Sequence, residues 1–197
     1  MLHQLKLGNS VNKRDYLFCM KVLIDEKWLR VLKEDVEFPN GVKIKDFYTV
    51  ERPTYSAVVP FISPSALLLV KQYRHGPKED ILNIPMGVID EGESPLESAQ
   101  RELEEETGYT AQKMISAGVF ENAPSFLRLK CYLFIALDLT KVSTKNNDSD
   151  ELTETIIISI ERALKMISSG EIKDMTTAIG IFTAFLSQIN KLDKPKS

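Results

Sequence analysis

The stretch Gly87–Tyr109, GVIDEGESPLESAQRELEEETGY, decides the fold, because the rest of the chain can be arranged around it. It starts as an acidic loop and continues into a predicted helix over residues 95–107. Ser94 is suited to cap this helix, with Pro at the first helical position and Glu97 completing a capping box. Gly108 is typical of a helix end. The stretch therefore predicts a loop, a helix and a sharp stop.

Acidic residues gather toward the end of this helix. Glu102 and Glu106 are four residues apart and share a face, which Glu105 joins. Like charges at this spacing repel each other, and the C-terminal end of a helix disfavours anions. Arg101 relieves only part of this repulsion. The helix alone leaves two interpretations open, a solvated acidic face and a site for a hard divalent cation, and the solvated face is the more common one.

The spacing of the whole stretch separates these interpretations. It follows the pattern G-x5-E-x7-R-E-U-x-E-E-x-G-U, where U is apolar or aromatic. At roughly 6% usage per residue type, its seven fixed identities would match a given start by chance about once in 10⁸ to 10⁹. The matching residues are Gly87, Glu93, Arg101, Glu102, Leu103, Glu105, Glu106, Gly108 and Tyr109. This pattern is the Nudix box, and the chain resembles the Nudix hydrolase family.

The resemblance implies a metal platform. It assigns Mg²⁺, or Mn²⁺, to four ligands: Glu102, Glu105, Glu106 and the backbone carbonyl of Met86. Glu105 is also expected to act in catalysis. Glu93 would pair with Arg101 and orient the helix, which is an indirect but important task. Metals would neutralise and polarise a pyrophosphate and activate water for in-line attack on phosphorus.

The bulk properties fit an ordinary globular protein. The 197 residues are 43% hydrophobic and 27% charged, with a net charge of −3, which argues against non-specific nucleic-acid binding. We expect no signal peptide and no membrane span. The two cysteines, Cys19 and Cys131, lie in apolar runs and are expected to be buried thiols. The cytoplasm is the expected compartment.

Period-two patterns dominate the regions on both sides of the box. Residues 16–50 predict three strands with a turn at Pro39–Gly41, which we take as an N-terminal antiparallel β subdomain over 1–52. Residues 53–197 are expected to form the Nudix domain, an α+β fold in which a mixed sheet lies in an α/β/α sandwich. Its predicted strands are 56–62, 66–73, 114–120, 131–139 and 156–160, and its predicted helices besides 95–107 are 161–169 and 175–189. Residues 140–155 are predicted to form an exposed loop.

Three features resemble the ADP-ribose pyrophosphatase branch of the family. The N-terminal strands, with Trp28 and Arg52, look like the subdomain that builds a homodimer and part of the nucleotide site. Arg74, which ends the predicted strand ALLLVKQYR, is expected to contact the diphosphate. Pro124 lies where this branch has a marker proline, although an ordinary turn would also explain it.

The chain departs from the branch at two places. Asn83 stands where a Glu tied to nucleotide recognition is common, and Ser125–Arg128 replace a Gly and a following acid. These departures affect the base and the sugar more than the bond that is cleaved. The branch also uses a loop glutamate near the catalytic water. Glu151 is expected in that role as general base, with Glu154 as the fallback, although both could simply be solvated.

The sequence therefore predicts Mg²⁺-dependent hydrolysis of ADP-ribose, or of a related nucleoside diphosphate sugar, by a homodimer. Another nucleotide class is the alternative: a dinucleoside polyphosphate, a nucleoside triphosphate or an RNA cap. A non-catalytic domain that senses ADP-ribose is a third reading, but it would be expected to have eroded box glutamates.

Overall fold

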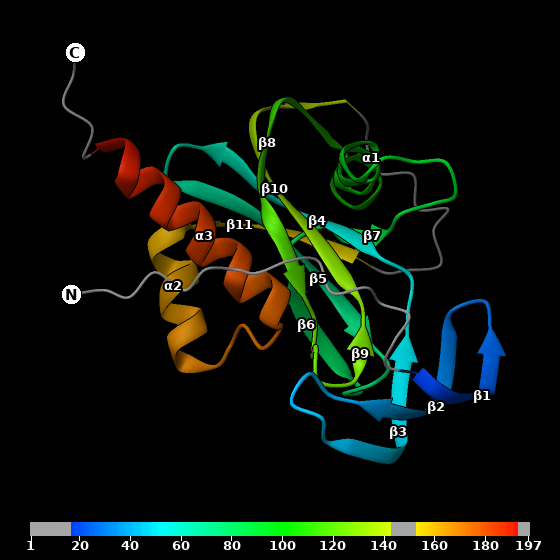
Figure 1. Cartoon of the computed structure of the whole chain (residues 1–197). Coiled ribbons are helices and arrows are strands. Elements are labelled where there is room, and N and C mark those ends of the chain that lie inside the picture. Colours follow the sequence, from blue (N-terminus) through cyan, green and yellow to red (C-terminus); the bar gives the residue numbers. More distant parts are fainter. Residues whose placement is uncertain (1–16, 143–152, 193–197) are drawn as a thin grey trace, which may run out of the picture. The chain divides into compact units, whose positions relative to one another are not determined.

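The computed structural model describes residues 17–142 and 153–192, whose elements are labelled in Figure 1. The described residues form two compact units. The first contains the residues up to Arg52 together with Ala123–Arg128, and the second contains Pro53–Asn122 and the residues from Leu129 onward. The chain therefore passes between the units three times, after Arg52, after Asn122 and after Arg128.

The first unit is a four-stranded sheet in the order β1-β2-β3-β9. Its strands are β1 (Leu17–Glu26), β2 (Leu29–Glu37), β3 (Lys43–Glu51) and β9 (Leu127–Arg128). The first three strands pair antiparallel, as their period-two patterns predicted, whereas β9 pairs parallel to β3. Gly41, with φ of 83°, allows the turn between β2 and β3.

The second unit is built on a sheet of seven strands in which β11-β5-β4-β10-β8 form the main path. β6 pairs with β5 and β7 pairs with β4. β4 and β10 run parallel and the other pairs run antiparallel, so the predicted mixed sheet is confirmed. The strands are β4 (Tyr55–Ser63), β5 (Ala66–Arg74), β6 (Glu79–Asn83), β7 (Met86–Val88), β8 (Tyr109–Glu121), β10 (Lys130–Lys141) and β11 (Thr153–Ser159).

Helices cover both faces of this sheet (Figure 1). Val58 of β4 packs in a core cluster with Ala99 and Leu103 of α1 (Pro95–Thr107). Its neighbour Val59 belongs to the opposite cluster, which includes Ile181 of α3 (Met175–Leu192) and residues of α2 (Ile160–Ser169). Successive strand residues point to opposite faces, so β4 must be apolar on both. The predicted α/β/α sandwich is confirmed.

Two boundaries differ from the prediction. β8 begins at Tyr109, directly after α1, because its first residues pair with the end of β10 around Leu139 and Lys141. The predicted loop over residues 140–155 is shortened at both ends, since β10 reaches Lys141 and β11 begins at Thr153. Polarity suggested a loop there, but pairing along the sheet extends both strands. Among the described helices, none has the length and apolar character needed to cross a membrane.

Candidate active site

The loop and helix of the acidic stretch are fixed at both ends by local hydrogen bonds. The Ser94 hydroxyl accepts from the backbone N–H of Glu97 at 3.3 Å, and the Glu97 carboxylate accepts from the Ser94 N–H at 2.8 Å. The predicted capping box is therefore present. Gly108 ends α1 with a left-handed φ of 75°, and its N–H donates to the Glu104 carbonyl.

Helix α1 is held against the sheet by a polar contact as well as by its apolar face. The hydroxyl of Ser98, which is fully buried, lies 2.7 Å from the hydroxyl of Ser56 in β4. The Ser98 hydroxyl also lies 3.5 Å from the carbonyl of Val88, at the end of β7. These contacts join the helix to the strand that precedes the acidic loop. Nothing in the spacing of the box pointed to Ser98.

Gly87 brings the backbone of β7 very close to Glu102. A Cβ atom at position 87 would lie 1.9 Å from the Oε1 atom of Glu102, well inside any real contact distance. Only glycine therefore allows this approach. The first glycine of the box is needed for space, because it lets a carboxylate from α1 lie on the backbone of β7.

Arg101 is the centre of the charged network. Its guanidinium donates twice to Glu93, with Nε 3.0 Å from Oε1 and Nη2 3.1 Å from Oε2. Its Nη1 atom lies 2.6 Å from Glu102 Oε1 and 3.0 Å from Glu105 Oε2. Nη2 also donates to the Val88 carbonyl at 3.0 Å. A bidentate pair of this kind fixes orientation as well as charge, so Glu93 and Arg101 lock the acidic loop onto the helix.

The network shifts the pKa values of its members in opposite directions. The hydrogen bond from Arg101 lowers the pKa of Glu93, and the same bond is the largest cause that raises the pKa of Arg101. Burial raises the pKa of Glu102, and the hydrogen bond from Arg101 offsets only part of this shift. Glu102 is therefore a largely buried carboxylate that lies between Arg101 and the backbone of β7.

Glu106 approaches the same piece of backbone as Glu102. The N–H of Met86 donates to Glu106 Oε2 at 3.3 Å. Two glutamates one helical turn apart therefore reach Met86 and Gly87, next to the predicted carbonyl ligand. In the part of the chain that the structure describes, no three acidic, histidine or cysteine side chains already form a metal cage. Arg101 also donates to Glu105, and the carboxylate oxygens gathered here are the kind of donor that a hard divalent cation binds.

Arg74 and Asn83 form a second pair in this unit. The Nε atom of Arg74 donates to Asn83 Oδ1 at 3.3 Å across the β5–β6 ladder. Asn83 is 4% exposed and directly precedes Ile84 and Pro85, the residues that lead to the box. An amide partner orients the guanidinium without neutralising it, so Arg74 keeps its full positive charge for an anion.

The other predicted binding residues lie in the first unit. Trp28 is 51% exposed, and the ammonium of Lys27 lies 4.3 Å from its ring centre. Arg52 is exposed and its N–H donates to the Arg128 carbonyl, while Pro124 is exposed in the segment that leads to β9. Their roles in binding stay predictions.

The structure describes only one of the two glutamates that the sequence suggested as general base. Glu151 lies outside the described residues. Glu154 is exposed in β11, opposite Lys71 of β5, so it belongs to a strand and not to the loop that the sequence suggested. The β-branched residues around it, Thr153, Thr155 and the run Ile156–Ile158, favour a strand.

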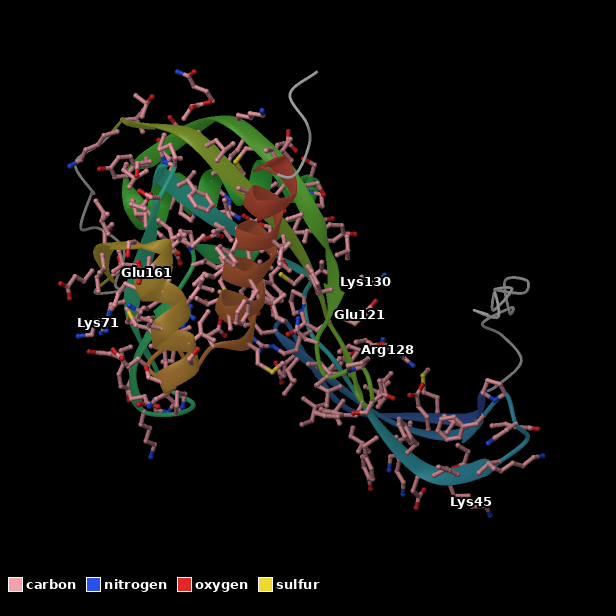
Figure 2. The ribbon with its side chains drawn as sticks, turned by 90° about the vertical axis from the view of Figure 1, so that its left-hand side faces the viewer. Lys45, Lys71, Glu121, Arg128, Lys130 and Glu161 are labelled. Atoms are coloured by element: carbon pink, nitrogen blue, oxygen red, sulfur yellow. The ribbon has the colours of Figure 1, made fainter. Side chains whose placement is uncertain are left out.

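A buried acid in the first unit was not predicted from the sequence. Glu34 of β2 is 2% exposed and bonds with the hydroxyl of Thr49. Arg128 (Figure 2) lies with Nη2 3.2 Å from Glu34 Oε1 and with Nη1 2.5 Å from Glu51 Oε1. This network ties the segment after Asn122 to the N-terminal strands. An acid in the alternating pattern of β2 was the only signal, and it pointed equally to a solvated face.

The comparisons with known proteins agree on one family. The model of the NUDIX domain matches residues 52–176. The chain is 38% identical over 149 residues to the ADP-ribose pyrophosphatase of Bacillus subtilis, covering 75% of this chain and 80% of that protein. It is 35% identical over 156 residues to the methanol dehydrogenase activator of Bacillus methanolicus, covering 77% and 84% of the two chains.

A solved structure supports the same fold. The crystal structure of an ADP compounds hydrolase superposes with a TM-score of 0.79 and covers 93% of this chain and 98% of that one, at 24% identity. At that identity the likeness bears on the fold only. The family match, the 38% identical relative and the complete box lead to one conclusion: the chain belongs to the Nudix family.

Proposed function

We propose that the protein hydrolyses the pyrophosphate bond of ADP-ribose, or of a related nucleoside diphosphate sugar, to a nucleoside monophosphate and a sugar phosphate. The observation that carries this proposal is the pair Glu102 and Glu106, both of which reach the Met86–Gly87 backbone. Two relatives, an ADP-ribose pyrophosphatase and an ADP compounds hydrolase, favour this substrate class by their names.

Nudix hydrolases generally use a divalent metal, and we propose Mg²⁺, with Mn²⁺ as a substitute. Glu102, Glu105, Glu106 and the Met86 carbonyl would hold it. Such an ion would screen the diphosphate and lower the pKa of a water molecule. Glu93 supports the site by orienting Arg101, which keeps the glutamates from repelling one another before the metal binds. Glu151 is proposed as the general base.

Substrate binding is proposed to depend on Arg74. Its guanidinium is oriented by a neutral amide, and it forms no ion pair with any of the residues that the structure describes. A diphosphate would provide the negative charge that Arg74 lacks as a partner. The guanidinium could bind two of its oxygens at once. Asn83 acts through Arg74 in this proposal, while Trp28, Arg52 and Pro124 would contribute to nucleotide binding.

We further propose a homodimer formed through the N-terminal strands. β1 has exposed apolar side chains on both of its faces, including Val22, Leu23 and Ile24. Apolar surface of this kind is unusual on a monomer and typical of an interface. Sedimentation of the wild type and of an Ile24→Glu variant tests this, because a charge there should shift a dimer to monomers. We expect the protein to work in the cytoplasm.

The decisive experiment is a substrate panel with Mg²⁺ and product identification. We expect ADP-ribose to be the best substrate and to give AMP and ribose 5-phosphate. Clear preference for a nucleoside triphosphate, a dinucleoside polyphosphate or a capped RNA would favour the alternative nucleotide class. Binding of ADP-ribose without turnover would favour a sensor, although the complete box argues against this.

One variant tests the metal assignment within the same panel. Glu106→Gln keeps the size of the side chain and removes its charge. Its turnover should fall by more than the roughly 100-fold that indirect partners of metal ligands reach. Near-wild-type turnover at saturating Mg²⁺ would contradict the assignment.

A further inference from the structure

We infer that Thr177, in the first turn of α3, is a positioning residue for the backbone that presents the Met86 carbonyl. The inference rests on the proposed function, since it concerns the metal site of the same reaction. It assigns a role in this site to α3, a helix that belongs to the core cluster on the opposite face of the sheet from α1.

The contacts of Thr177 link α3 to the segment before the box. Thr177 is 0% exposed, and its hydroxyl accepts from the backbone N–H of Ile84 at 3.0 Å. The same hydroxyl donates to Asp174 Oδ2 at 2.7 Å, and that carboxylate also accepts from the Thr177 N–H at 2.7 Å. Asp174 therefore caps the first turn of α3, and it aims the hydroxyl of Thr177 at Ile84.

Packing reinforces the polar contact one turn further along α3. A Cβ atom at Gly180 would lie 2.9 Å from Cδ1 of Ile84 and 3.0 Å from Cγ2 of Val59. Gly180 thus allows the helix to lie directly on the Ile84 side chain, which is 0% exposed. Ile84 is held by its N–H and by its side chain, both from α3.

The residues that follow Ile84 are fixed in turn. The Pro85 carbonyl accepts from the Val58 N–H at 3.0 Å, and the Met86 N–H donates to Glu106. Met86 is also paired with Ala57 in the β4–β7 ladder. Thr177 therefore anchors the first residue of a four-residue path, Ile84–Gly87, that ends where Glu102 and Glu106 converge.

Removing this anchor has a local consequence. Ile84 is fully buried, so its N–H would lose its partner where water has little access. The segment could recover a hydrogen bond only by moving, and Met86 would move with it. Groups that orient metal ligands commonly affect metal affinity by about 10-fold or more. A purely structural role would instead lower stability and leave metal affinity unchanged.

The experiment measures Mn²⁺ binding directly, by electron paramagnetic resonance of free Mn²⁺ in the absence of substrate, together with the Mg²⁺ dependence of turnover. Thr177→Val removes the hydroxyl at nearly constant volume, Thr177→Ser keeps it, and Thr177→Cys replaces it with a weak acceptor. Thr176→Val is the matched control, because the hydroxyl of Thr176 lies 2.7 Å from that of Tyr55 and not against Ile84.

We expect Thr177→Val and Thr177→Cys to weaken Mn²⁺ binding by about 10-fold and to raise the Mg²⁺ requirement in parallel. Thr177→Ser should stay within about twofold of the wild type, and so should Thr176→Val even if its melting temperature falls. If Thr177→Val fails to fold, Thr177→Cys decides.

Unchanged Mn²⁺ binding in the folded variants, or equal weakening by Thr176→Val, would overturn the inference. A wild type that binds Mn²⁺ but hydrolyses no member of the panel would overturn the proposed function alone.

Discussion

Gly87 and Glu102 occupy space that only a glycine can share: a methyl group at position 87 would lie 1.9 Å from Glu102 Oε1. The contact joins the middle of β7 to the middle of α1. The glycine of the box is therefore required for space beside Glu102. It is not required for a left-handed backbone conformation, since φ at Gly87 is not positive.

Gly87→Ala should therefore abolish most activity with a small change in stability. The carboxylate of Glu102 must move to admit the methyl group, and a displacement of about 1 Å within an active site can cost about 100-fold in rate. Turnover and the thermal midpoint are the measurements. Gly76→Ala is the control, since a Cβ atom there meets nothing within 4 Å and φ is not left-handed. Equal activity of the two variants would refute the argument.

The pair Glu93–Arg101 predicts a specific pH dependence. The pKa of Glu93 is lowered from its ordinary 4.5, chiefly by the hydrogen bond from Arg101. A lowered pKa in the folded state stabilises the fold above the unfolded pKa, and this stabilisation is lost as the pH falls through the folded value. Glu93→Gln should thus be less stable than the wild type at pH 7, and the gap should close below about pH 4.5.

Thermal melts of both proteins between pH 3 and pH 7 provide the test. The difference between the two midpoints is the relevant quantity, because other carboxylates titrate in both proteins. A gap that stayed constant with pH would show that Glu93 acts through packing and not through its charge.

Arg128 should matter more for stability than its exposure suggests. Arg128→Ala would leave the carboxylate of Glu34, which is 2% exposed, without its cation. Orphaning a buried charge is costly, but Arg128 itself is 54% exposed, so we expect a loss of about 1–3 kcal/mol. Urea unfolding measures it, and Arg128→Ala combined with Glu34→Gln should recover part of the loss.

Lys130→Ala is the matched control for Arg128→Ala. Lys130 lies 3.7 Å from Glu121 on the neighbouring strand (Figure 2), and both side chains are about half exposed. Such a pair contributes less than about 1 kcal/mol. Equal effects of the two variants would mean that the burial of Glu34 has no energetic consequence.

Cys131 should behave as an inert thiol. It is 2% exposed, and burial raises its pKa from 9.0 to about 11. In a Cys19→Ser protein, reaction with a disulfide reagent at pH 8 should be at least about 100-fold slower than for an open thiol, because the reactive thiolate is that much rarer. Unfolding in urea should restore the ordinary rate. Fast reaction of the folded protein would contradict the burial of this side chain.

Much of the fold could be predicted from the sequence, because local rules and burial agree there. The capping box at Ser94, the stop at Gly108 and the apolar pattern of β4 each depend on residues close in sequence. The predicted start of β8, residue 114, lies several residues after its actual start at Tyr109. The first residues of this strand are mostly polar, and pairing with β10 specifies them. Pairing partners of this kind are invisible in a local window.

The contacts of the candidate site and of the first unit also differ in how far they could be predicted from the sequence. The spacing of the box predicted Glu102, Glu106 and the pair Glu93–Arg101 as site residues, and all of them lie within a short stretch. Thr177 lies 93 residues from its partner Ile84, and Arg128 lies 94 from Glu34. No periodicity links residues so far apart, so contacts between elements had to come from the structure.

The pairing of β9 with β3 has a consequence for how the protein is made. Glu51 meets Arg128 across 77 residues of chain, and that interval holds the whole of α1 and β8. A ribosome must therefore extend the nascent chain well past α1 before the N-terminal sheet can gain its fourth strand. Until then β3 has an open edge, which is where a nascent chain is prone to wrong pairing. Slow translation just before Arg128 should raise the yield of misassembled chains.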